Sequence, residues 1–302
     1  MKSKTDLASH IRVNIAAALE EDLGALSPAL SRERERETGN RVTVTPDADL
    51  TAQLIPEHTP GHATVITRQR MVLCGTQWFE GCFRALDANC DIRWHVREGE
   101  LAEANQTLCE IRGEARALLT AERSALNFLQ MLSATATATR RYVDEVAGTK
   151  AKIMDTRKTL PGLRMAQKYA VTVGGGHNQR IGLFDGILIK ENHILAAGGV
   201  RAALEAAYRL APPDATIQIE VESLEELRAA LDARAKLILL DNFDLEKMRA
   251  AVSLTAGRAE LEASGGVNLQ TVRAIAETGV DRISIGSLTK DVQAVDLSMR
   301  FA

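Results

Sequence analysis

The second half of the chain alternates short apolar segments with amphipathic ones, and this pattern constrains its fold more than any other feature of the sequence. The apolar segments have the length and composition of buried β-strands: KIMDTR, DGILIKENH, TIQIEVES, KLILLDNF, AELEASGG and DRISIGS. Several are separated by stretches with helical spacing of apolar residues: VRAALEAAYRL, LEELRAALDAR, LEKMRAAVSLT and LQTVRAIAETG. Strands that alternate with helices predict a parallel sheet with crossover helices, either a doubly wound sheet or a β/α barrel.

Polar residues stand at the C-terminal end of nearly every predicted strand. In chain order they are Asp155, Arg157 and Lys158; Lys190, Glu191 and Asn192; Glu220 and Glu222; Asp241 and Asn242; Ser264 and Gly265; and Gly286 and Ser287. In a β/α barrel these ends converge on one mouth, where barrel enzymes keep their active sites. An open sheet would collect ligands mainly at one switch point and would draw on fewer strands. The pattern therefore favours the barrel.

The first half of the chain has a different texture. Residues 8–23 carry apolar side chains at helical spacing, and Gly24 ends the run as a C-cap glycine would. The segment 31–40, SRERERETGN, alternates charge without an apolar anchor and predicts an exposed, mobile loop. Further on, short β-branched segments broken by glycine predict an antiparallel sheet, and from Thr120 the spacing indicates one long helix or two in sequence.

Length, charge and cysteine content exclude several classes of protein. With 302 residues, 45% of them hydrophobic, the chain can bury the core of one large domain or two ordinary ones. The 37 Lys and Arg nearly balance the 40 Asp and Glu, so nothing global favours nucleic acid or an anionic membrane as a partner. We expect no secretory signal and no membrane span, which would need about 18 consecutive apolar residues. The four cysteines lack C-x-x-C spacing and predict buried free thiols in a cytoplasmic protein.

Glycine-containing turns follow the last two predicted strands. The segment ASGGVNLQ places Gly265 and Gly266 between a strand and a helix, with Asn268 as the expected N-cap, and ISIGSLTK repeats the arrangement at Gly286. In β/α barrels the loops after the last strands often bind phosphate. One glycine pair would need no more explanation than a tight turn, whereas two consecutive turns favour a phosphate site.

Cations form a second group of candidate residues: Arg157, Lys158, Arg180 and Lys190, with Arg123 on a helix before the barrel. Arg157 and Lys158 close a strand and Lys190 has apolar neighbours, so a charge there needs an anionic partner or a function. Arginine binds carboxylate or phosphate through two parallel hydrogen bonds, and several cations at one mouth predict a multiply anionic ligand. Other cations are expected to be solvated surface charges: Arg140, Arg141, Arg164 and Lys168.

Two carboxylates, Glu220 and Asp241, end neighbouring predicted strands. Beside a phosphate site they suit Mg²⁺, which binds a few carboxylates together with phosphate oxygens, or the hydroxyls of a ribose. Ion pairing with the nearby cations is the alternative, and the sequence leaves both open. The segment VGGGHNQR (173–180) predicts a flexible loop near the mouth, whose glycines permit close backbone approach or lid motion.

Long motifs over almost the whole chain resemble the quinolinate phosphoribosyltransferases, the decarboxylating enzymes of NAD biosynthesis. These motifs are EEDLG, LTAERSALNFLQMLS, DTRKTLPGLR, GGGHNQRIGLFDGILIKENHI, IEVESLEEL, LILLDNF, SGGVNLQTVRAIAETGVDRISIGSLTK and AVDLSMRF. The resemblance implies transfer of phosphoribosyl from 5-phosphoribosyl 1-pyrophosphate to quinolinate with decarboxylation, giving nicotinate mononucleotide, pyrophosphate and CO₂. It also implies an N-terminal α/β sandwich domain, expected at 1–127 and rejoined by 291–302, and an incomplete β/α barrel at 128–290.

The same resemblance implies roles for individual residues. Cations matching Arg157, Lys158, Arg180 and Lys190 hold the pyridine dicarboxylate, and Arg123 matches an arginine that the neighbouring subunit of a homodimer contributes. Glu220 and Asp241 match an acidic pair near the ribose and Mg²⁺, and the cradle of the 5′-phosphate is matched by Ser264, Gly265, Gly266 and Gly286. Thr156, Gln179 and Ser287 are further expected substrate contacts. The expected catalytic residues are Lys158, Lys190, Glu220 and Asp241.

Two departures from the family limit this transfer. Gln179 stands where many members carry histidine, and glutamine can donate a hydrogen bond to a carboxylate but cannot move a proton. The charged segment 31–40 is an insertion relative to the family pattern, which predicts a longer surface loop.

Other functions remain compatible with the residues alone. One is a Schiff-base aldolase or lyase with Lys190 as nucleophile, which borohydride trapping would reveal. A phosphoribosyltransferase for another ring is a second, and a non-catalytic protein that binds a phosphorylated ligand is a third.

Overall fold

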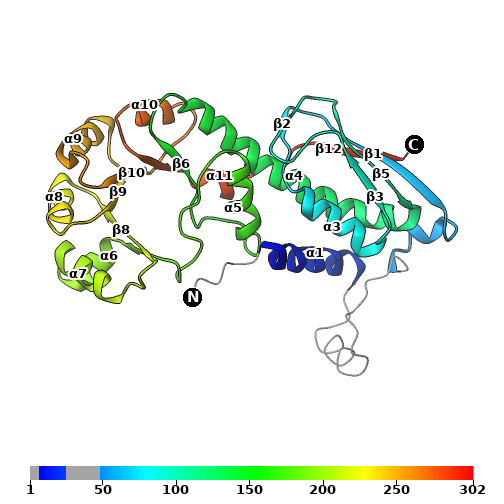
Figure 1. The fold of residues 1–302 in the computed structure, drawn as a ribbon, viewed down its shortest axis with the longest axis horizontal. Coiled ribbons are helices and arrows are strands. Elements are labelled where there is room, and N and C mark those ends of the chain that lie inside the picture. Colours follow the sequence, from blue (N-terminus) through cyan, green and yellow to red (C-terminus); the bar gives the residue numbers. More distant parts are fainter. Residues whose placement is uncertain (1–6, 25–47, 302) are drawn as a thin grey trace, which may run out of the picture. The chain divides into compact units, whose positions relative to one another are not determined.

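The computed structural model describes residues 7–24 and 48–301, so the charged segment 31–40 lies outside the described residues. The chain divides into two compact units, one within Met1–Thr137 and Val292–Ala302 and the other within Ala138–Asp291. Both are seen in Figure 1.

The long helix α4 (Ala115–Glu145) contributes residues to both units, because the division falls after Thr137. The boundary that the sequence suggested, after residue 127, also lies inside this helix. The predicted helical run from Thr120 is therefore one continuous helix that begins earlier than expected.

The first unit contains an antiparallel sheet with the strand order β12-β1-β5-β3. Its strands are β1 (Pro60–Thr67), β3 (Asp91–Trp94), β5 (Thr107–Glu114) and β12 (Leu297–Phe301). Two short strands pair separately, β2 (Met71–Val72) with β4 (Leu101–Ala102), and a short 3-10 helix, η2, covers Ala52–Leu54. The predicted antiparallel sheet is confirmed.

Helices complete this unit. Helix α1 (Leu7–Leu23) ends at Gly24, whose φ of 69° is the left-handed conformation that the sequence predicted for a C-cap. Helix α3 (Thr76–Leu86) buries Trp78, Phe79 and Phe83, and the ring of Phe79 packs against Trp94 of β3 with centroids 5.3 Å apart. Aromatic side chains thus attach the helix to the sheet.

The second unit contains a six-stranded parallel sheet with the order β6-β11-β10-β9-β8-β7. Its strands are β6 (Lys152–Met154), β7 (Gly186–Ile189), β8 (Thr216–Val221), β9 (Leu237–Asp241), β10 (Glu260–Ser264) and β11 (Arg282–Ser284). Strands β6 and β7 form its two edges, so the sheet is open. The predicted α/β class and incomplete barrel are confirmed.

Helices alternate with these strands, and Figure 1 shows α7 to α10 lined up along one side of the sheet. The helices are α5 (Arg164–Val173), α6 (Glu191–Ala197), α7 (Val200–Leu210), α8 (Leu224–Asp232), α9 (Leu245–Thr255), α10 (Val272–Ala276) and α11 (Ser287–Lys290). Their buried faces join strand residues such as Ile219, Ile238 and Ala263 in one hydrophobic core. Helix α10 begins at Val272, and in the turn before it Asn268 accepts hydrogen bonds at Oδ1 from the backbone N–H groups of Gln270 and Thr271, the pattern of an N-cap side chain.

The glycine-rich segment lies along the free edge of β6. His177 forms a β-bridge with Met154, and its backbone N–H donates to Ile153 at 2.8 Å. At Gly176 a Cβ would lie 2.7 Å from Cγ2 of Thr139 and 2.9 Å from Cγ1 of Val171, so no larger residue fits without movement. Of the two uses predicted for these glycines, the structure shows close backbone approach.

The four cysteines are free and buried, as predicted. Burial raises the pKa of Cys82 to about 12 and that of Cys90 to about 11, which keeps both thiols protonated and unreactive. Within residues 7–24 and 48–301, no helix is both long enough and apolar enough to span a bilayer.

Candidate active site

The C-terminal ends of the parallel strands bring the expected site residues of the second unit to one edge of the sheet. Glu220 lies in β8, Asp241 ends β9 and Ser264 ends β10. The others follow β6, the glycine-rich segment, β7, β10 and β11: Thr156, Arg157, Lys158, Gln179, Arg180, Lys190, Gly265, Gly266, Gly286 and Ser287. Arg123 is exposed on α4 within the first unit. We call this edge of the second unit the mouth.

The loops after β6 and β11 meet at the mouth. A Cβ on Gly286 would lie 3.1 Å from Cδ of Lys158 and 3.8 Å from Oγ1 of Thr156. Thr289 in α11 donates its hydroxyl to the backbone oxygen of Lys158 at 2.7 Å. The first and last strands of the unit therefore place Lys158 beside the glycine turn, although they lie far apart in sequence.

Two arginines at the mouth, Arg157 and Arg180, lie close enough for their charges to interact, and the charge of Asp185 partly offsets this repulsion at Arg180. Arg180 donates to the backbone oxygen of Gly186 at 3.0 Å; burial lowers its pKa, and the charge of Arg157 lowers it further. The Nε of Arg157 is buried and has no hydrogen-bond partner among the described residues. A buried charged donor without an acceptor costs about 1–3 kcal/mol or more. The geometry therefore fits an anionic ligand.

Carboxylates gather at the ends of β8 and β9. Glu220 pairs with Lys190 at 3.6 Å, so the ion pairing that the sequence left open is present. The pKa of Glu222 is raised, first by the charge of Glu191 and also by Asp241 and Glu220, so this side of the mouth concentrates negative charge. Lys190 is half-exposed and charge-paired, unlike the desolvated lysines that form Schiff bases.

These acidic residues fit a metal that is bound mainly by its substrate. No cluster of three or more His, Cys, Asp or Glu residues could hold a metal ion in the part of the chain that is described. Mg²⁺ commonly binds through one or two carboxylates plus substrate phosphates, and not in an all-protein cage. Glu220 and Asp241 on adjacent strands match that requirement.

Glycines shape the turn after β10. Gly265 and Gly266 have φ values of 101° and 60°, in the left-handed region, and a Cβ on Gly265 would run into the Oδ1 of Asn242. Asn242 follows Asp241 on the neighbouring strand, and its side chain donates to that carboxylate at 3.0 Å. The turn after β10 is thus packed directly against the acidic side of the mouth.

Comparison with known proteins decides the family. A family model described as "Quinolinate phosphoribosyl transferase, N-terminal domain" matches residues 49–133, and one described as "Quinolinate phosphoribosyl transferase, C-terminal domain" matches residues 135–300. The chain belongs to the quinolinate phosphoribosyltransferase family. The resemblance inferred from the sequence motifs is confirmed, and the chain is an enzyme.

Relatives in this family match along most of their length. The chain is 40% identical over 251 residues to a probable nicotinate-nucleotide pyrophosphorylase (carboxylating) of Bacillus subtilis (strain 168), covering 83% of this chain and 87% of that protein. It is 47% identical over 211 residues to the enzyme of that name from Mycobacterium leprae (strain TN), covering 69% and 74%. The solved nicotinate-nucleotide pyrophosphorylase of Francisella tularensis superposes with a TM-score of 0.85 at 40% identity, covering 97% of this chain and 96% of that one.

A buried ion pair supports the mouth of this family member, and its position corrects one expectation. Lys168, predicted to be a solvated surface charge, has a side chain only 3% exposed, and its Nζ lies 2.6 Å from Oδ1 of fully buried Asp155. Burial raises the pKa of Asp155 and lowers that of Lys168, while the pair's mutual attraction opposes both shifts. The prediction was wrong because α5 is buried on more than one side, and Lys168 turns inward on the same side as Val171, three residues later.

The pair fixes the segment that carries Arg180. Asp155 also accepts from the backbone N–H of Gln179 at 2.8 Å and from Nδ2 of Asn178 at 3.2 Å, and Lys168 donates to the backbone oxygen of Gln179 at 3.0 Å.

The surface prediction also fails for Arg164. Its guanidinium is partly buried and bonds to Oγ1 of Thr159 at 3.1 Å and to the backbone oxygens of Arg157 and Ile181, both at 3.3 Å. It therefore holds together two loops that reach the mouth.

The side chain of Gln179 points into the barrel, where its amide is hydrogen-bonded to other side chains. Its Nε2 donates to the two carboxylate oxygens of Glu262 at 2.6 and 2.5 Å and to Oε1 of Gln218 at 3.2 Å. Its N–H groups are therefore already used. Sequence reasoning did not single out Glu262, although a carboxylate inside a parallel strand buried on both faces was a signal.

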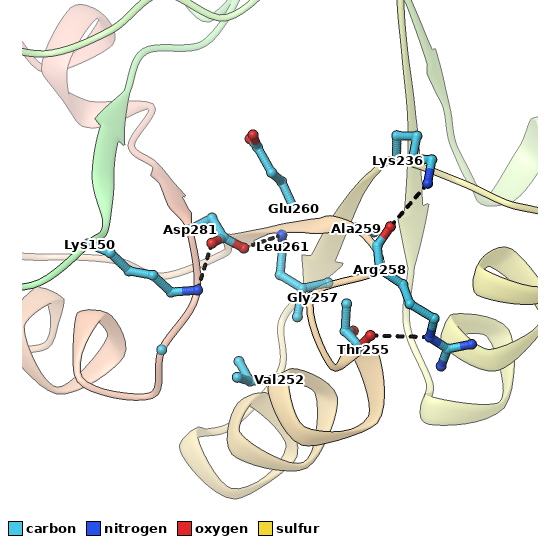
Figure 2. Close-up of a pocket in the computed structure, with 11 residues that line it drawn as sticks. Lys150, Lys236, Val252, Thr255, Gly257, Arg258, Ala259, Glu260, Leu261 and Asp281 are labelled. Carbon is cyan, nitrogen blue, oxygen red and sulfur yellow. Dashed lines mark hydrogen bonds and ion pairs between the residues drawn. The ribbon is translucent and has the colours of Figure 1, made fainter.

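A cavity of about 390 Å³ lies at the opposite ends of the strands, and Figure 2 shows the residues around it. Its charged groups have partners: Lys150 pairs with Asp281 at 2.7 Å, Lys236 donates to the backbone oxygen of Arg258 at 3.4 Å, and Arg258 donates to carbonyls at the end of α9. No expected site residue lines it. The expected site residues of this unit lie instead at the mouth, at the other ends of the strands.

Proposed function

We propose that the mouth binds quinolinate through Arg157, Arg180, Lys158 and Lys190 and carries out phosphoribosyl transfer there. The activity itself is that of a quinolinate phosphoribosyltransferase in de novo NAD biosynthesis. The observation that carries the residue assignment is the buried Nε of Arg157, near Arg180, for which the described residues supply no hydrogen-bond acceptor. Two guanidinium groups match a ligand with two carboxylates, because each binds a carboxylate through parallel hydrogen bonds.

The acidic side of the mouth supports the transfer step. When the pyridine nitrogen displaces pyrophosphate, positive oxocarbenium character develops at the ribose, and the carboxylates of Glu220 and Asp241 are suited to stabilise it. Lys190, paired with Glu220, lies where it can neutralise a carboxylate of the ring or the leaving group. Transfer turns the ring into a pyridinium, which stabilises the carbanion left when the adjacent carboxylate departs as CO₂. The protein mainly positions and neutralises the reactants and supplies no nucleophile.

The glycine turns are suited to the 5′-phosphate. Gly286 and Ser287 follow β11, and Gly286 lies beside Lys158, while Ser264 ends β10 and is followed by Gly265 and Gly266; the backbone N–H groups of such turns suit a phosphate. Glu220 and Asp241 would hold Mg²⁺, which neutralises the pyrophosphate when bound. Arg123 is proposed to complete the site of a second subunit in a homodimer, and a cytoplasmic location is consistent with four buried free thiols.

Release of CO₂ and pyrophosphate from quinolinate plus phosphoribosyl pyrophosphate is the direct test. We expect both products in equal amounts, and turnover lower by on the order of a hundredfold when Mg²⁺ is removed by a chelator. Nicotinate in place of quinolinate is the matched control, since it lacks the carboxylate that leaves. Equal turnover of both rings, or undiminished turnover without Mg²⁺, would contradict the proposal.

Changing Gly265 to alanine is expected to raise the KM for phosphoribosyl pyrophosphate by about tenfold or more, since the new Cβ displaces Asn242 next to Asp241. Gly257→Ala is the matched control, because Gly257 also has a positive φ, 75°, but no atom lies within 4 Å of its added Cβ. Both variants bear the backbone strain, so their difference isolates the contact. Steady-state kinetics that give the two variants the same KM would count against a role of this turn in binding.

A further inference from the structure

Glu262 is a buried acid beneath the mouth, and no step described so far uses it. It is fully buried in β10, and its oxygens receive three hydrogen bonds from side-chain amides, two from Gln179 and one from Gln218 at 3.1 Å. Burial raises its pKa, and the hydroxyl of Ser284 is a further partner. Burying a carboxyl costs free energy that an apolar side chain of similar size would not. Its presence in the core therefore calls for a specific use.

The residues around Glu262 form a polar layer directly below the site. Gln218, Glu262 and Ser284 each precede a mouth residue by two positions, namely Glu220, Ser264 and Gly286. Alternate residues of a strand face the same side, so this layer and the mouth share one face of the sheet. The layer spans β8, β10 and β11 and reaches Gln179 in the glycine-rich segment.

Hydrogen bonds fix both the backbone and the side chain of Gln179, the residue before Arg180. Its backbone N–H bonds to Asp155, its backbone oxygen accepts from Lys168, and its side chain is anchored on Glu262. Arg180 follows directly, and its guanidinium donates to the backbone oxygen of Gly186 at 3.0 Å. The direction in which the guanidinium enters the mouth thus depends on how residue 179 is fixed.

We propose that Glu262 is a positioning residue of the reaction, which locks the Gln179 amide inside the barrel and so orients Arg180 toward the substrate's carboxylates. This inference rests on the proposed role of Arg180. It assigns to Gln179 a structural contact with Glu262 in place of a direct contact with quinolinate. Glu262 touches no reactant and acts through its neighbours.

The test replaces Glu262 with leucine, which fills the volume without a polar group. We expect a folded protein of somewhat lower thermal stability, because the buried amides of Gln179 and Gln218 lose their acceptor, with the KM and Kd for quinolinate raised about tenfold and the KM for phosphoribosyl pyrophosphate changed less than twofold. Thr255→Val is the matched control, because Thr255 is also polar and buried but lines the cavity at the far ends of the strands. Its Oγ1 has no partner among the described residues. The control should leave both constants unchanged.

A donor–acceptor swap separates positioning from packing. Glu262→Gln places two amides against each other and should weaken quinolinate binding, whereas the double variant Glu262→Gln with Gln179→Glu restores one donor and one acceptor and should recover most of the affinity. The single variant Glu262→Gln and the double variant also test the proposal if Glu262→Leu does not fold. Wild-type quinolinate affinity in folded Glu262→Leu, an equal rise of both KM values, or no recovery in the double variant would each overturn the proposal. Absence of turnover in the unmodified enzyme would instead refute the proposed function, while calorimetric binding still tests this inference.

Discussion

Replacing Arg157 with alanine is expected to weaken quinolinate binding by roughly thirtyfold or more and to leave the fold intact. The Nε of Arg157 is buried and has no hydrogen-bond partner within residues 7–24 and 48–301, and Arg180 adds a second positive charge nearby. Removing one member of a desolvated charge pair with a ligand costs about 2–5 kcal/mol, which weakens binding roughly thirtyfold to several thousandfold. Isothermal titration calorimetry with quinolinate measures the loss, and thermal unfolding should stay near that of the unmodified protein because the substitution also removes charge repulsion.

Two further arginine variants sharpen this prediction. Arg157→Lys keeps the charge but loses the two-pronged geometry, so its affinity should fall between those of the alanine variant and the unmodified protein. Arg258→Ala removes an arginine of the same unit at the opposite ends of the strands, where its guanidinium donates to carbonyls of α9. It should bind quinolinate normally. Unchanged affinity in Arg157→Ala would count decisively against the cationic site.

Replacing Lys168 with methionine is expected to lower the free energy of unfolding by about 3–5 kcal/mol. The substitution keeps the length of the side chain but leaves the carboxylate of Asp155, which is fully buried, without its counter-ion. Burial already raises the pKa of Asp155, so the remaining group is expected to take up a proton and lose part of its hydrogen bonding to Asn178 and Gln179. Chemical denaturation at neutral pH measures the change.

A second lysine in the same unit provides the control. Lys150 forms an ion pair of similar length, 2.7 Å, with Asp281, but it is more than half exposed. Lys150→Met should therefore cost only about 0–1 kcal/mol. Asp155→Asn combined with Lys168→Met should recover part of the stability, since it removes the unpaired charge and retains an oxygen acceptor. Equal losses of unfolding free energy for the two single lysine variants would show that burial does not make the Lys168–Asp155 pair more important for stability.

Much of the site was predictable because parallel strands obey a simple rule. Every strand of a parallel sheet presents its C-terminal end on the same edge, so polar residues that close successive strands must come together. Arg157, Glu220, Asp241 and Ser264 were found in this way, and the structure places them at one mouth. Glycines after β10 and β11 were predictable for a related reason, because a turn with positive φ favours residues without a Cβ.

The supporting residues were harder to predict because their environment comes from distant parts of the chain. Lys168 lies on a helix whose sequence resembles many solvated ones, and only the return of the glycine-rich segment along β6 buries it. Glu262 occupies an ordinary strand position, and its amide partners come from β8 and from residue 179. A single sequence does not show directly which distant residues come into contact in the fold.

The sequence by itself determined the order of strands and helices, the parallel sheet and the residues at its mouth, since periodicity and strand direction are local properties. Tertiary structure alone decided which charges are buried, which are paired and which are free. Arg157 and Lys168 illustrate the difference, since both are cations near the same strand end. In the described part of the chain the Nε of Arg157 has no hydrogen-bond partner, whereas Lys168 neutralises Asp155 inside the fold. The free energy of a charge depends on its solvent and its neighbours, and both are set only when the chain has folded.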